Sequence, residues 1–334
     1  MTNVILTGIK PTGQPHLGNY LGAIKPALEM AMNHQDDKKY FFIADYHALT
    51  TLKDARLMAQ YRQTIAATWL SFFNGQKNCY FYFQSDIPEI FELYWILSCF
   101  CPKGMLNRAH AYKGLVAKNT ENEHDPDRNI NHGLYSYPVL MAADICLFHA
   151  NKVPVGADQK QHVEIAGEIV KHINKQVTNK IPKPEPLIDI NADIIIGTDG
   201  QKMSKNYNNT IPLFTPENEL KKCVAKIQTD SIPLGSPLNA DTCNVFKLAS
   251  YIASDKDLFQ LKENYDSGTI GYGHAKQQLT ELFLTYFSDA RRQYQQLMAQ
   301  PQQIKQQMNQ STVAIRDIAK SNLFAIKQAL GIEH

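Results

Sequence analysis

The sequence predicts an α/β protein in which a doubly wound parallel sheet is followed by a small, all-helical C-terminal domain. Three observations support this fold class. Short β-branched and aromatic runs alternate with helical patterns over the first half of the chain. Strand patterns stop after about residue 212, and helical patterns follow. The length of 334 residues suits two domains, at roughly 100–200 residues each.

The first half supplies the predicted sheet and the helices that cover it. The strand patterns are Val4–Thr7, Tyr40–Ala44, Cys79–Phe83 and Ile194–Ile196. The helical patterns are Leu17–Asn33, Lys53–Phe73, Pro88–Phe100, Tyr137–Ala150 and Asp158–Lys175. Strands separated by helices of this length predict a parallel sheet covered on both faces, which binds its ligand at the carboxyl ends of the strands.

The remaining segments predict loops and a helical second half. Residues 114–133 are polar and predict an exposed, mobile loop, whereas the prolines of Ile181–Pro186 predict a connection. The later helical patterns cover about 216–227, 244–253, 255–266, 273–298 and 312–330. Thr215 before Pro216 is typical of a helix start.

Composition excludes several classes of protein. The 34 Lys and Arg residues exceed the 32 Asp and Glu residues by only two, which does not favour a polybasic nucleic-acid binder. Apolar stretches such as Val139–Phe148 are too short for a membrane span of about 20 residues, and the N-terminus lacks a signal pattern. We therefore expect no membrane association and a cytoplasmic location.

Six cysteines are spread along the chain without a Cys-x-x-Cys pair. No His pair stands at zinc-finger spacing, so no zinc site is expected. Reduced, mostly buried thiols are the simplest interpretation.

A turn-rich loop, Gly8–His16, follows the first predicted strand. His16 and Asn19 stand at the start of the next helix, where backbone N–H groups and the helix dipole favour an anion. Gly18 would let a base or a phosphate approach the backbone closely. The same pattern also suits a plain strand–turn–helix in which His16 caps the helix.

A second loop, Lys202-Met-Ser-Lys-Asn206, carries two lysines three residues apart. Both can reach one polyphosphate, because each is a point charge on a flexible stem. A solvated lysine-bearing loop is the alternative. In a doubly wound sheet both loops lie at the same edge, which favours a shared phosphate site.

The pattern Tyr137, Met141, Asp144, Phe148 places one carboxylate on an apolar and aromatic helix face. Pro138 suits the first turn of that helix. A buried carboxylate needs a partner. Either Asp144 pairs within the core, or it ends a flat slot for a planar aromatic ligand with one N–H or O–H donor.

These motifs together resemble a known enzyme family. His16-Leu-Gly-Asn19 is similar to the HIGH motif, and Lys202–Asn206 to the KMSKS motif, of class I aminoacyl-tRNA synthetases. The pocket segment and Val153–Glu164 resemble the bacterial tryptophanyl-tRNA synthetases, from residue 3 to about 230 and more weakly beyond. The resemblance implies a Rossmann-like catalytic domain that activates tryptophan with ATP, releases pyrophosphate, and transfers tryptophan to tRNA(Trp).

The resemblance also assigns roles to residues of this chain. The catalytic group is His16, Asn19, Lys202 and Lys205. The ATP-binding group is Lys10, Pro11, Thr12, Gly18, Asn19, Gly156, Ala157, Asp158, Ile194, Lys202, Met203, Ser204, Lys205 and Asn206. The tryptophan-binding group is Leu6, His47, Tyr137, Met141, Asp144, Ile145 and Gln159, with Asp144 accepting the indole N–H.

The resemblance further implies domains and partners. Residues 1–205 would form the catalytic domain, with 312–334 packing back on it, and 206–311 would bind the anticodon. A homodimer is expected. Mg²⁺ would travel with ATP, and neither a resident metal nor an iron–sulfur cluster is expected, since only Cys223 and Cys243 lie in the helical region. With a net charge of +1 for residues 206–334 (13 basic minus 12 acidic), tRNA binding would depend on local groups such as Lys221, Lys222 and Lys226.

Departures from the family pattern keep alternatives open. Leu6, Lys10, Leu115, Ala157 and Asn206 stand where many relatives carry Phe, Gln, Lys, Glu and Ser. A tyrosyl enzyme is the nearest alternative, but its usual pocket glutamine is Met141 here, which favours indole over phenol. Two further alternatives are a HIGH-type nucleotidylyltransferase and a non-catalytic paralogue.

Overall fold

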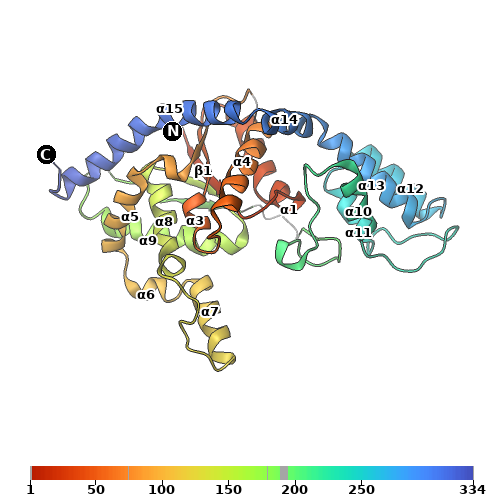
Figure 1. The fold of residues 1–334 in the computed structure, drawn as a ribbon, viewed down its shortest axis with the longest axis horizontal. Coiled ribbons are helices and arrows are strands. Elements are labelled where there is room, and N and C mark those ends of the chain that lie inside the picture. Colours follow the sequence, from red (N-terminus) through yellow and green to blue (C-terminus); the bar gives the residue numbers. More distant parts are fainter. Residues whose placement is uncertain (1, 74, 179, 189–194, 334) are drawn as a thin grey trace. The chain divides into compact units, whose positions relative to one another are not determined.

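The computed structural model describes residues 2–73, 75–178, 180–188 and 195–333 (Figure 1). The chain forms two compact units. The first comprises Met1–Gly13, Pro26–Asp189 and Gln300–His334, and the second comprises Gln14–Lys25 and Ile190–Ala299. These boundaries differ from a simple division after residue 205, since residues 14–25 group with the second unit.

A five-stranded parallel sheet in the order β3-β2-β1-β4-β5 forms the centre of the first unit. The strands are β1 (Val4–Ile9), β2 (Lys38–Ile43), β3 (Cys79–Phe83), β4 (Lys152–Pro154) and β5 (Glu185–Leu187). The chain proceeds outward from β1 to β3, then returns to the other side of β1 with β4. This change of direction between β1 and β4 is the point at which open α/β sheets bind ligands.

Apolar side chains in β1 and β2 explain why these strands are central. Leu6 pairs with Tyr40 across the strands, and both are buried. Gly8 pairs with Phe42, and a Cβ on Gly8 would lie 2.5 Å from the Phe42 ring. A larger residue at position 8 would therefore displace Phe42 from the core.

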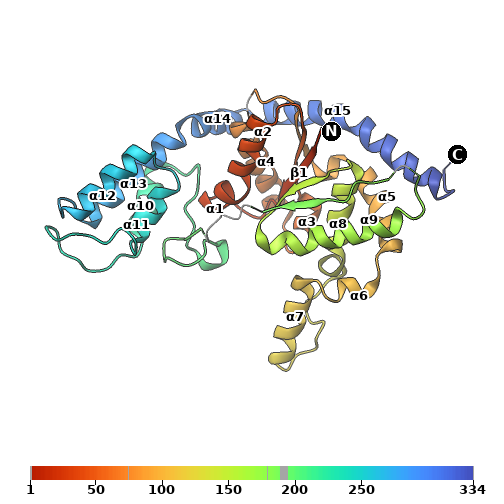
Figure 2. The same cartoon turned by 180° about the vertical axis from the view of Figure 1, so that it is seen from behind.

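Helices cover the sheet of the first unit (Figures 1 and 2). The helices of this unit are α2 (Lys25–Asn33), α3 (Asp45–Ala48), α4 (Ala55–Phe72), α5 (Glu89–Phe100), α6 (Lys103–Leu106), α7 (His110–Glu121), α8 (His132–Leu147), α9 (Lys160–Ile173) and α15 (Pro301–Ala329), with single 3₁₀ turns at Gln84–Asp86 and Ala157–Gln159. Helix α4 packs on β2 and β3, α9 packs beside β5, and α5, α8 and α9 pack on one another. The long α15 lies against β3, α4 and α5.

The second unit is helical. It contains α1 (Leu17–Asn19), a π-helical turn at Tyr20–Ile24, a 3₁₀ turn at Lys205–Tyr207, α10 (Glu217–Ala225), α11 (Asn244–Ser250), α12 (Asp255–Asp266), α13 (Tyr272–Tyr286) and α14 (Ser288–Ala299). Helix α13 packs on α10, α11 and α14. Buried Leu220, Leu248 and Phe283 belong to this core.

The structure confirms the parallel sheet and the helical second half of the predicted fold, with four corrections. Residues 114–121 belong to α7 rather than to a loop; no α7 residue is buried, so apolar periodicity could not reveal it. Helix α8 begins at His132, which places Pro138 inside the helix rather than in its first turn. The last strand is β5; Ile196 forms only an isolated bridge to Lys202, and Ile194 lies outside the described residues. Helix α15 begins at Pro301, not at 312.

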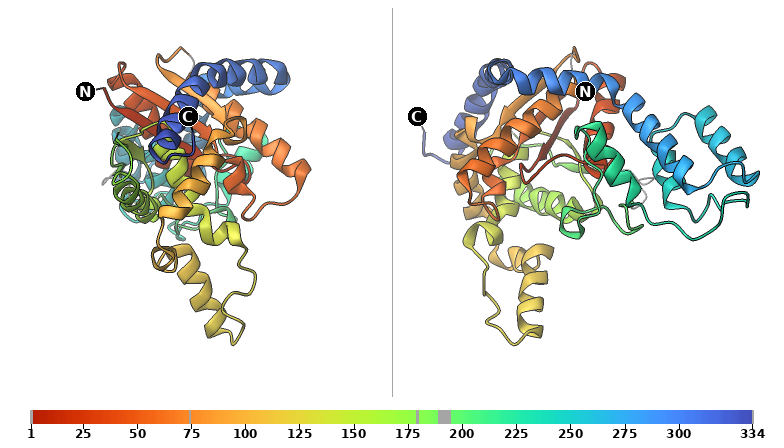
Figure 3. Two further views of the ribbon diagram at one scale, coloured as in Figure 1. Left: turned by 90° about the vertical axis from the view of Figure 1, so that its left-hand side faces the viewer. Right: turned by 45° about the vertical axis from the view of Figure 1, so that its right-hand side comes forward.

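Helices α6 and α7 project away from the sheet of the first unit (Figure 3). Among the described residues, every helix is too short or too polar to span a bilayer.

Candidate active site

His16 is fixed at the start of α1 by the main chain around it. The N–H of His16 donates to Oδ1 of Asn19 at 3.1 Å, so Asn19 caps the turn that carries the histidine. The imidazole is buried, and no described residue is a hydrogen-bond partner for its Nδ1. Burial and the charge of Lys205 lower the pKa of His16 to about 4, so its ring is neutral at pH 7. A buried nitrogen of this kind needs an external partner.

The second predicted loop is held in shape by Asn209. Oδ1 of Asn209 accepts the N–H of Ser204 at 2.8 Å, and its Nδ2 donates to the carbonyl of Lys202 at 3.1 Å. Nδ2 also donates to Asp199 at 2.7 Å. The Asn209 side chain therefore closes the loop across residues 202–204 and leaves the Lys202 and Lys205 side chains at the surface.

The two motifs touch each other within the second unit. The N–H of Gly18 points at Sδ of Met203 at 3.2 Å, although the two residues are 185 positions apart. A Cβ on Gly18 would lie 3.0 Å from His16 Nδ1 and 3.4 Å from Met203 Sδ, so this position favours glycine. The charge of Lys205 also acts on the His16 ring, so the fold brings these two residues of the predicted phosphate site near each other.

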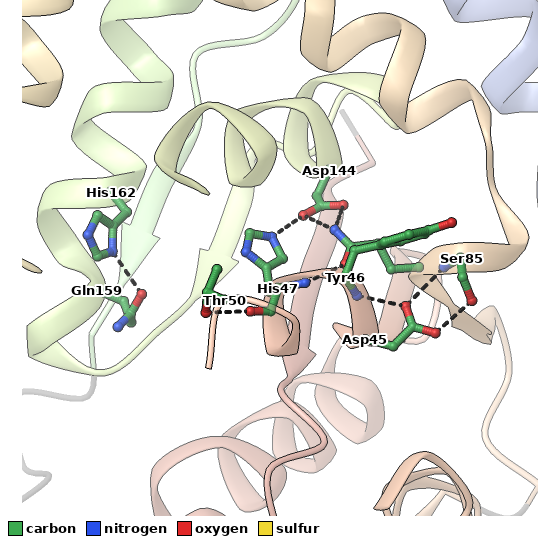
Figure 4. Close-up of polar contacts among 9 residues, drawn as sticks. Asp45, Tyr46, His47, Thr50, Ser85, Asp144, Gln159 and His162 are labelled. Carbon is green, nitrogen blue, oxygen red and sulfur yellow. Dashed lines mark hydrogen bonds and ion pairs between the residues drawn. The ribbon is translucent and has the colours of Figure 1, made fainter. Parts of the chain in front are cut away.

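In the first unit, Asp144 lies at the centre of a closed hydrogen-bond network (Figure 4). Its carboxylate has no exposed surface; Oδ2 accepts from His47 Nε2 at 2.9 Å, and both oxygens accept from Gln84 Nε2 at 2.9 and 3.0 Å. Oε1 of Gln84 accepts the N–H of His47 at 3.3 Å. Burial raises the pKa of Asp144, and the hydrogen bonds from His47 and Gln84 oppose that rise.

The structure shows the core pairing that one interpretation of Asp144 predicts, and the ligand-binding role stays a prediction. The carboxylate pairs with buried donors, as a core residue would. It nevertheless retains acceptor capacity, because a carboxylate can accept about four hydrogen bonds. Among its predicted neighbours Leu6 and Ile145 are buried and Met141 is partly exposed, whereas Phe148 stacks on Tyr40 with ring centroids 4.6 Å apart and belongs to the core.

A second polar chain runs from Tyr137 to Asp158. Nδ1 of His162 lies 2.8 Å from Gln159 Oε1, which can only accept, so Nδ1 carries the proton. Nε2 of His162 must then accept from the Tyr137 hydroxyl at 2.7 Å. Gln159 Nε2 in turn donates to Asp158 at 2.9 Å. Burial lowers the pKa of His162 to about 4, which keeps this neutral tautomer at pH 7.

The direction of this chain determines what Tyr137 can offer. Its hydroxyl proton is committed to His162, so its oxygen remains an acceptor for a cation. Lys10 Nζ lies 5.2 Å from the centroid of the Tyr137 ring. The Tyr137 oxygen can therefore accept one further hydrogen bond, while Lys10 places a cation over the face of the same ring.

The other predicted ATP residues follow the strands at the switch point. Lys10, Pro11 and Thr12 come after β1, and the exposed Gly156, Ala157 and Asp158 come after β4. Both segments lie at the carboxyl ends of neighbouring strands. Asn206 is exposed, and its N–H donates to Ser204 Oγ at 3.3 Å, which a serine at position 206 would also do.

Sequence reasoning missed three residues of this arrangement. Gln84 and Asn209 are buried amides, and each holds together a group that the sequence did identify. His162 lies one turn after Gln159 and sets the direction of the Tyr137 hydroxyl. Burial of a polar side chain was the missing signal, and it is visible only in three dimensions. Among the described residues, no group of three or more His, Cys, Asp or Glu side chains could hold a metal ion.

A parallel sheet with a HIGH-like turn in contact with a KMSKS-like loop defines a class I aminoacyl-tRNA synthetase. The family described as tRNA synthetases class I (W and Y) matches residues 2–288, and the chain belongs to it.

Similar proteins narrow the family to its tryptophan branch. A tryptophan–tRNA ligase from Pseudomonas aeruginosa is 45% identical over 99% of this chain and 74% of its own length. One from Campylobacter jejuni is 41% identical over 98% of this chain and 99% of its own. The crystal structure of tryptophanyl-tRNA synthetase from C. jejuni complexed with ADP and tryptophan is similar with a TM-score of 0.90 at 40% identity, covering 98% and 99% of the two chains.

Proposed function

We propose that this chain is a tryptophan–tRNA ligase that forms tryptophanyl-adenylate from L-tryptophan and ATP and then charges tRNA(Trp). The observation that carries the proposal is the contact between the two phosphate motifs at Gly18 and Met203, across 185 residues of chain. The full-length similarity to tryptophan–tRNA ligases supports the same conclusion.

Activation is a displacement at phosphorus. An oxygen of the tryptophan carboxylate attacks the α-phosphorus of ATP, the bond to the bridging oxygen breaks, and pyrophosphate leaves. Positioning and charge stabilisation supply most of the catalysis in such a reaction. The neutral ring of His16 donates one N–H to a phosphate oxygen, and the amide of Asn19 donates another. Lys202 and Lys205 neutralise the departing pyrophosphate.

The second step transfers the acyl group. A hydroxyl of the terminal tRNA ribose attacks the carbonyl carbon of the adenylate and gives up its proton to the departing phosphate, and AMP leaves with the electrons of the carbon–oxygen bond. Mg²⁺ enters as part of the ATP substrate, because Mg²⁺ keeps several waters and binds chiefly through phosphates in such sites.

Selectivity for tryptophan rests on Asp144. The indole N–H donates to this carboxylate, while Leu6 and Met141 contact the ring. Phenylalanine lacks the donor and would leave Asp144 with an unmet acceptor. A site built for a hydrogen-bonding group rejects the analogue without it by roughly 10⁴–10⁵-fold.

Tyr137 holds the amino-acid end of the substrate. Its hydroxyl oxygen is free to accept because its proton is directed to His162. The α-ammonium of tryptophan is a cation of the required size and sign. Gln159 accepts the hydrogen bond from Nδ1 of His162. It therefore supports the contact between Tyr137 and the ammonium group indirectly, through His162.

We also propose that the enzyme is a homodimer and works in the cytoplasm. Tyr46, Leu49 and Trp95 are exposed by 36%, 42% and 69%, and the Tyr46 and Phe91 rings lie 4.4 Å apart. Tyr46, Leu49 and Phe91 line a hollow of about 390 Å³, and Trp95 lies one turn along α5 from Phe91. We call Tyr46, Leu49, Phe91 and Trp95 the aromatic face. Exposed aromatic groups around a hollow are typical of a protein interface.

Recognition of tRNA belongs to the helical region, by analogy with the family. Lys221 pairs with Glu217 and Lys222 with Glu219 on the surface of α10. Exposed pairs of this kind are weak, so a phosphate can displace the carboxylates at little cost.

Amino-acid-dependent exchange of labelled pyrophosphate into ATP tests the proposal. Tryptophan should drive the exchange, and tyrosine and phenylalanine should not. Exchange with tyrosine alone would indicate the tyrosyl enzyme instead, and no exchange with any of the three would indicate a non-catalytic paralogue.

A further inference from the structure

Arg291 is a buried arginine far from both motifs in sequence. It lies on α14 with 9% of its surface exposed. Nη1 donates to the carbonyl of Leu213 at 2.5 Å, and Nη2 donates to the carbonyl of Thr215 at 2.6 Å. Between these two residues, the Phe214 ring stacks on Tyr294 of the same helix at 4.0 Å and 7°. Three consecutive residues are therefore anchored to one helix.

The anchored segment is bonded on its other side to the first phosphate motif. The N–H of Leu17 donates to the carbonyl of Ile211 at 2.9 Å, and the N–H of Leu213 donates to the carbonyl of Pro15 at 3.1 Å. His16 and Pro212 form an antiparallel bridge between these two bonds. Residues 15–17 are thus held against residues 211–213 by the main chain.

We propose that Arg291 is a positioning residue for adenylate formation. Its guanidinium fixes the carbonyls of residues 213 and 215, the 211–213 segment fixes residues 15–17, and the His16 ring is thereby held at the phosphate site. The inference rests on the proposed function for its effect on rate, but the geometry that it describes is a property of the folded chain. All the residues involved belong to the second unit.

The chemistry of arginine suits this role. A guanidinium presents its N–H groups in a rigid planar fork, so one side chain serves two carbonyls two residues apart. Lysine carries its three N–H donors on one nitrogen, so it lacks the fixed spacing of the guanidinium fork. Loss of the guanidinium leaves the carbonyl of the buried Leu213 without this donor, which is unfavourable away from water. The free energy of the loop would then favour other arrangements of residues 211–215.

Arg292 provides a matched control. It is the next residue of α14, but its side chain is 67% exposed and pairs with Asp289 on the surface. The variants to compare are Arg291→Met, Arg291→Lys, Arg292→Met and Phe214→Leu. Phe214→Leu loosens the same segment without removing a charge, so it carries the test if Arg291→Met does not fold.

Two measurements on each purified full-length variant decide the role. The first is pyrophosphate exchange, with kcat and the KM for tryptophan determined separately. The second is the titration of the His16 ring by NMR, assigned with a His16→Asn variant. We expect Arg291→Met to lower kcat roughly 10- to 100-fold, the scale of a misplacement of about 1 Å, with the KM for tryptophan unchanged. Arg291→Lys should retain more of the rate, and Arg292→Met should retain all of it.

The His16 titration separates positioning from stability. Burial and Lys205 keep the pKa of His16 at about 4, so loosening residues 15–17 should admit water and move it toward 6.5. A mere loss of stability would leave that pKa unchanged in the folded fraction. An unchanged His16 titration in Arg291→Met and Phe214→Leu would overturn the proposal. Absence of exchange in the unaltered protein would refute the proposed function instead, while the titration would still decide the role of Arg291.

Discussion

Asp144 shows how a single residue can be structural and functional together. Its carboxylate is fully buried and accepts hydrogen bonds from His47 and Gln84. The indole N–H of the proposed substrate would be a third donor. Two donors from different elements hold its orientation. The acceptor is therefore fixed in place before a ligand arrives, which reduces the entropy lost on binding.

Replacing Asp144 with alanine should lower kcat/KM for tryptophan about 10- to 100-fold, the effect of losing one charged hydrogen bond. The KM for ATP should stay the same, because Asp144 lies outside both phosphate motifs. Steady-state pyrophosphate exchange measures both, and thermal unfolding checks that the variant is folded. Unchanged kinetics with tryptophan would contradict the assignment.

Replacing Gln84 with methionine should shift the pH dependence of kcat/KM for tryptophan. Burial raises the pKa of Asp144 above its ordinary 3.8, and the Gln84 hydrogen bonds pull it down. Since the indole N–H needs the ionised carboxylate, kcat/KM for tryptophan should fall as the pH drops through this pKa. In Gln84→Met that acid limb should lie at higher pH. A limb at the same pH would mean that Gln84 does not tune the carboxylate.

At the scale of single residues, the sequence predicted the side chains that would bind the substrates better than the side chains that hold them in place. His16, Lys202, Lys205 and Asp144 could be proposed because their residue types suit phosphate and indole binding. The supporting residues Gln84, His162 and Asn209 could not be proposed. No sequence spacing distinguishes an amide or imidazole that forms a buried hydrogen bond from one that is exposed to solvent.

At the scale of elements, the loop after Ile196 behaves as one unit built on Asn209. Residues 197–209 are joined by the Gly197 N–H to Gln201 bond at 2.7 Å and by the three bonds of the Asn209 amide. A Cβ on Gly197 would lie 2.4 Å from Asn209. The loop shape is thus set inside the loop, and the two lysines are carried on it.

Replacing Asn209 with alanine should lower kcat of pyrophosphate exchange roughly 10- to 100-fold, because Lys202 and Lys205 lose their fixed placement. The exposed Asn206 gives a control on the same loop: Asn206→Ser should leave kcat within about twofold, since it restores the small hydroxyl residue of the family motif. Equal losses in the two variants would show that the loop has no internal anchor. Thermal unfolding again separates loss of placement from loss of fold.

Helices and strands could be predicted from the sequence where one of their faces is buried, and could not where no face is buried. The first three strands and the helices around Lys53–Phe73 and Pro88–Phe100 follow from apolar runs and periodicity. Strands β4 and β5 have three residues each, too few for a period. Helix α8 is buried over much of its surface, so its start at His132 left no amphipathic signal.

On the scale of the whole molecule, the sheet and the phosphate motifs belong to different compact units. Residues 14–25 separate from the strand that they follow and group with residues 190–299. A boundary drawn from composition could not find this division, because it depends on long-range contacts such as Leu17 with Ile211.

The aromatic face predicts the state of assembly. Replacing Trp95 with glutamate should raise the dimer dissociation constant roughly 30-fold or more, the effect of losing a 2 kcal/mol interface residue. Multi-angle light scattering over a dilution series measures the mass directly. Met32→Glu is the control, since Met32 is also exposed, by 56%, but lies on α2. A dimer that is equally stable in both variants would place the interface elsewhere.

The projecting α6–α7 segment should unfold locally more readily than the packed helices of the first unit. Helix α7 has no buried residue, so few apolar contacts oppose its local unfolding. Its amide hydrogens should therefore exchange with deuterated water far sooner than those of α8, whose middle residues are buried. Proteases that cut after lysine should act first at Lys113 and Lys118, and the same segment is the natural place to insert a fluorescent label without disturbing the sheet.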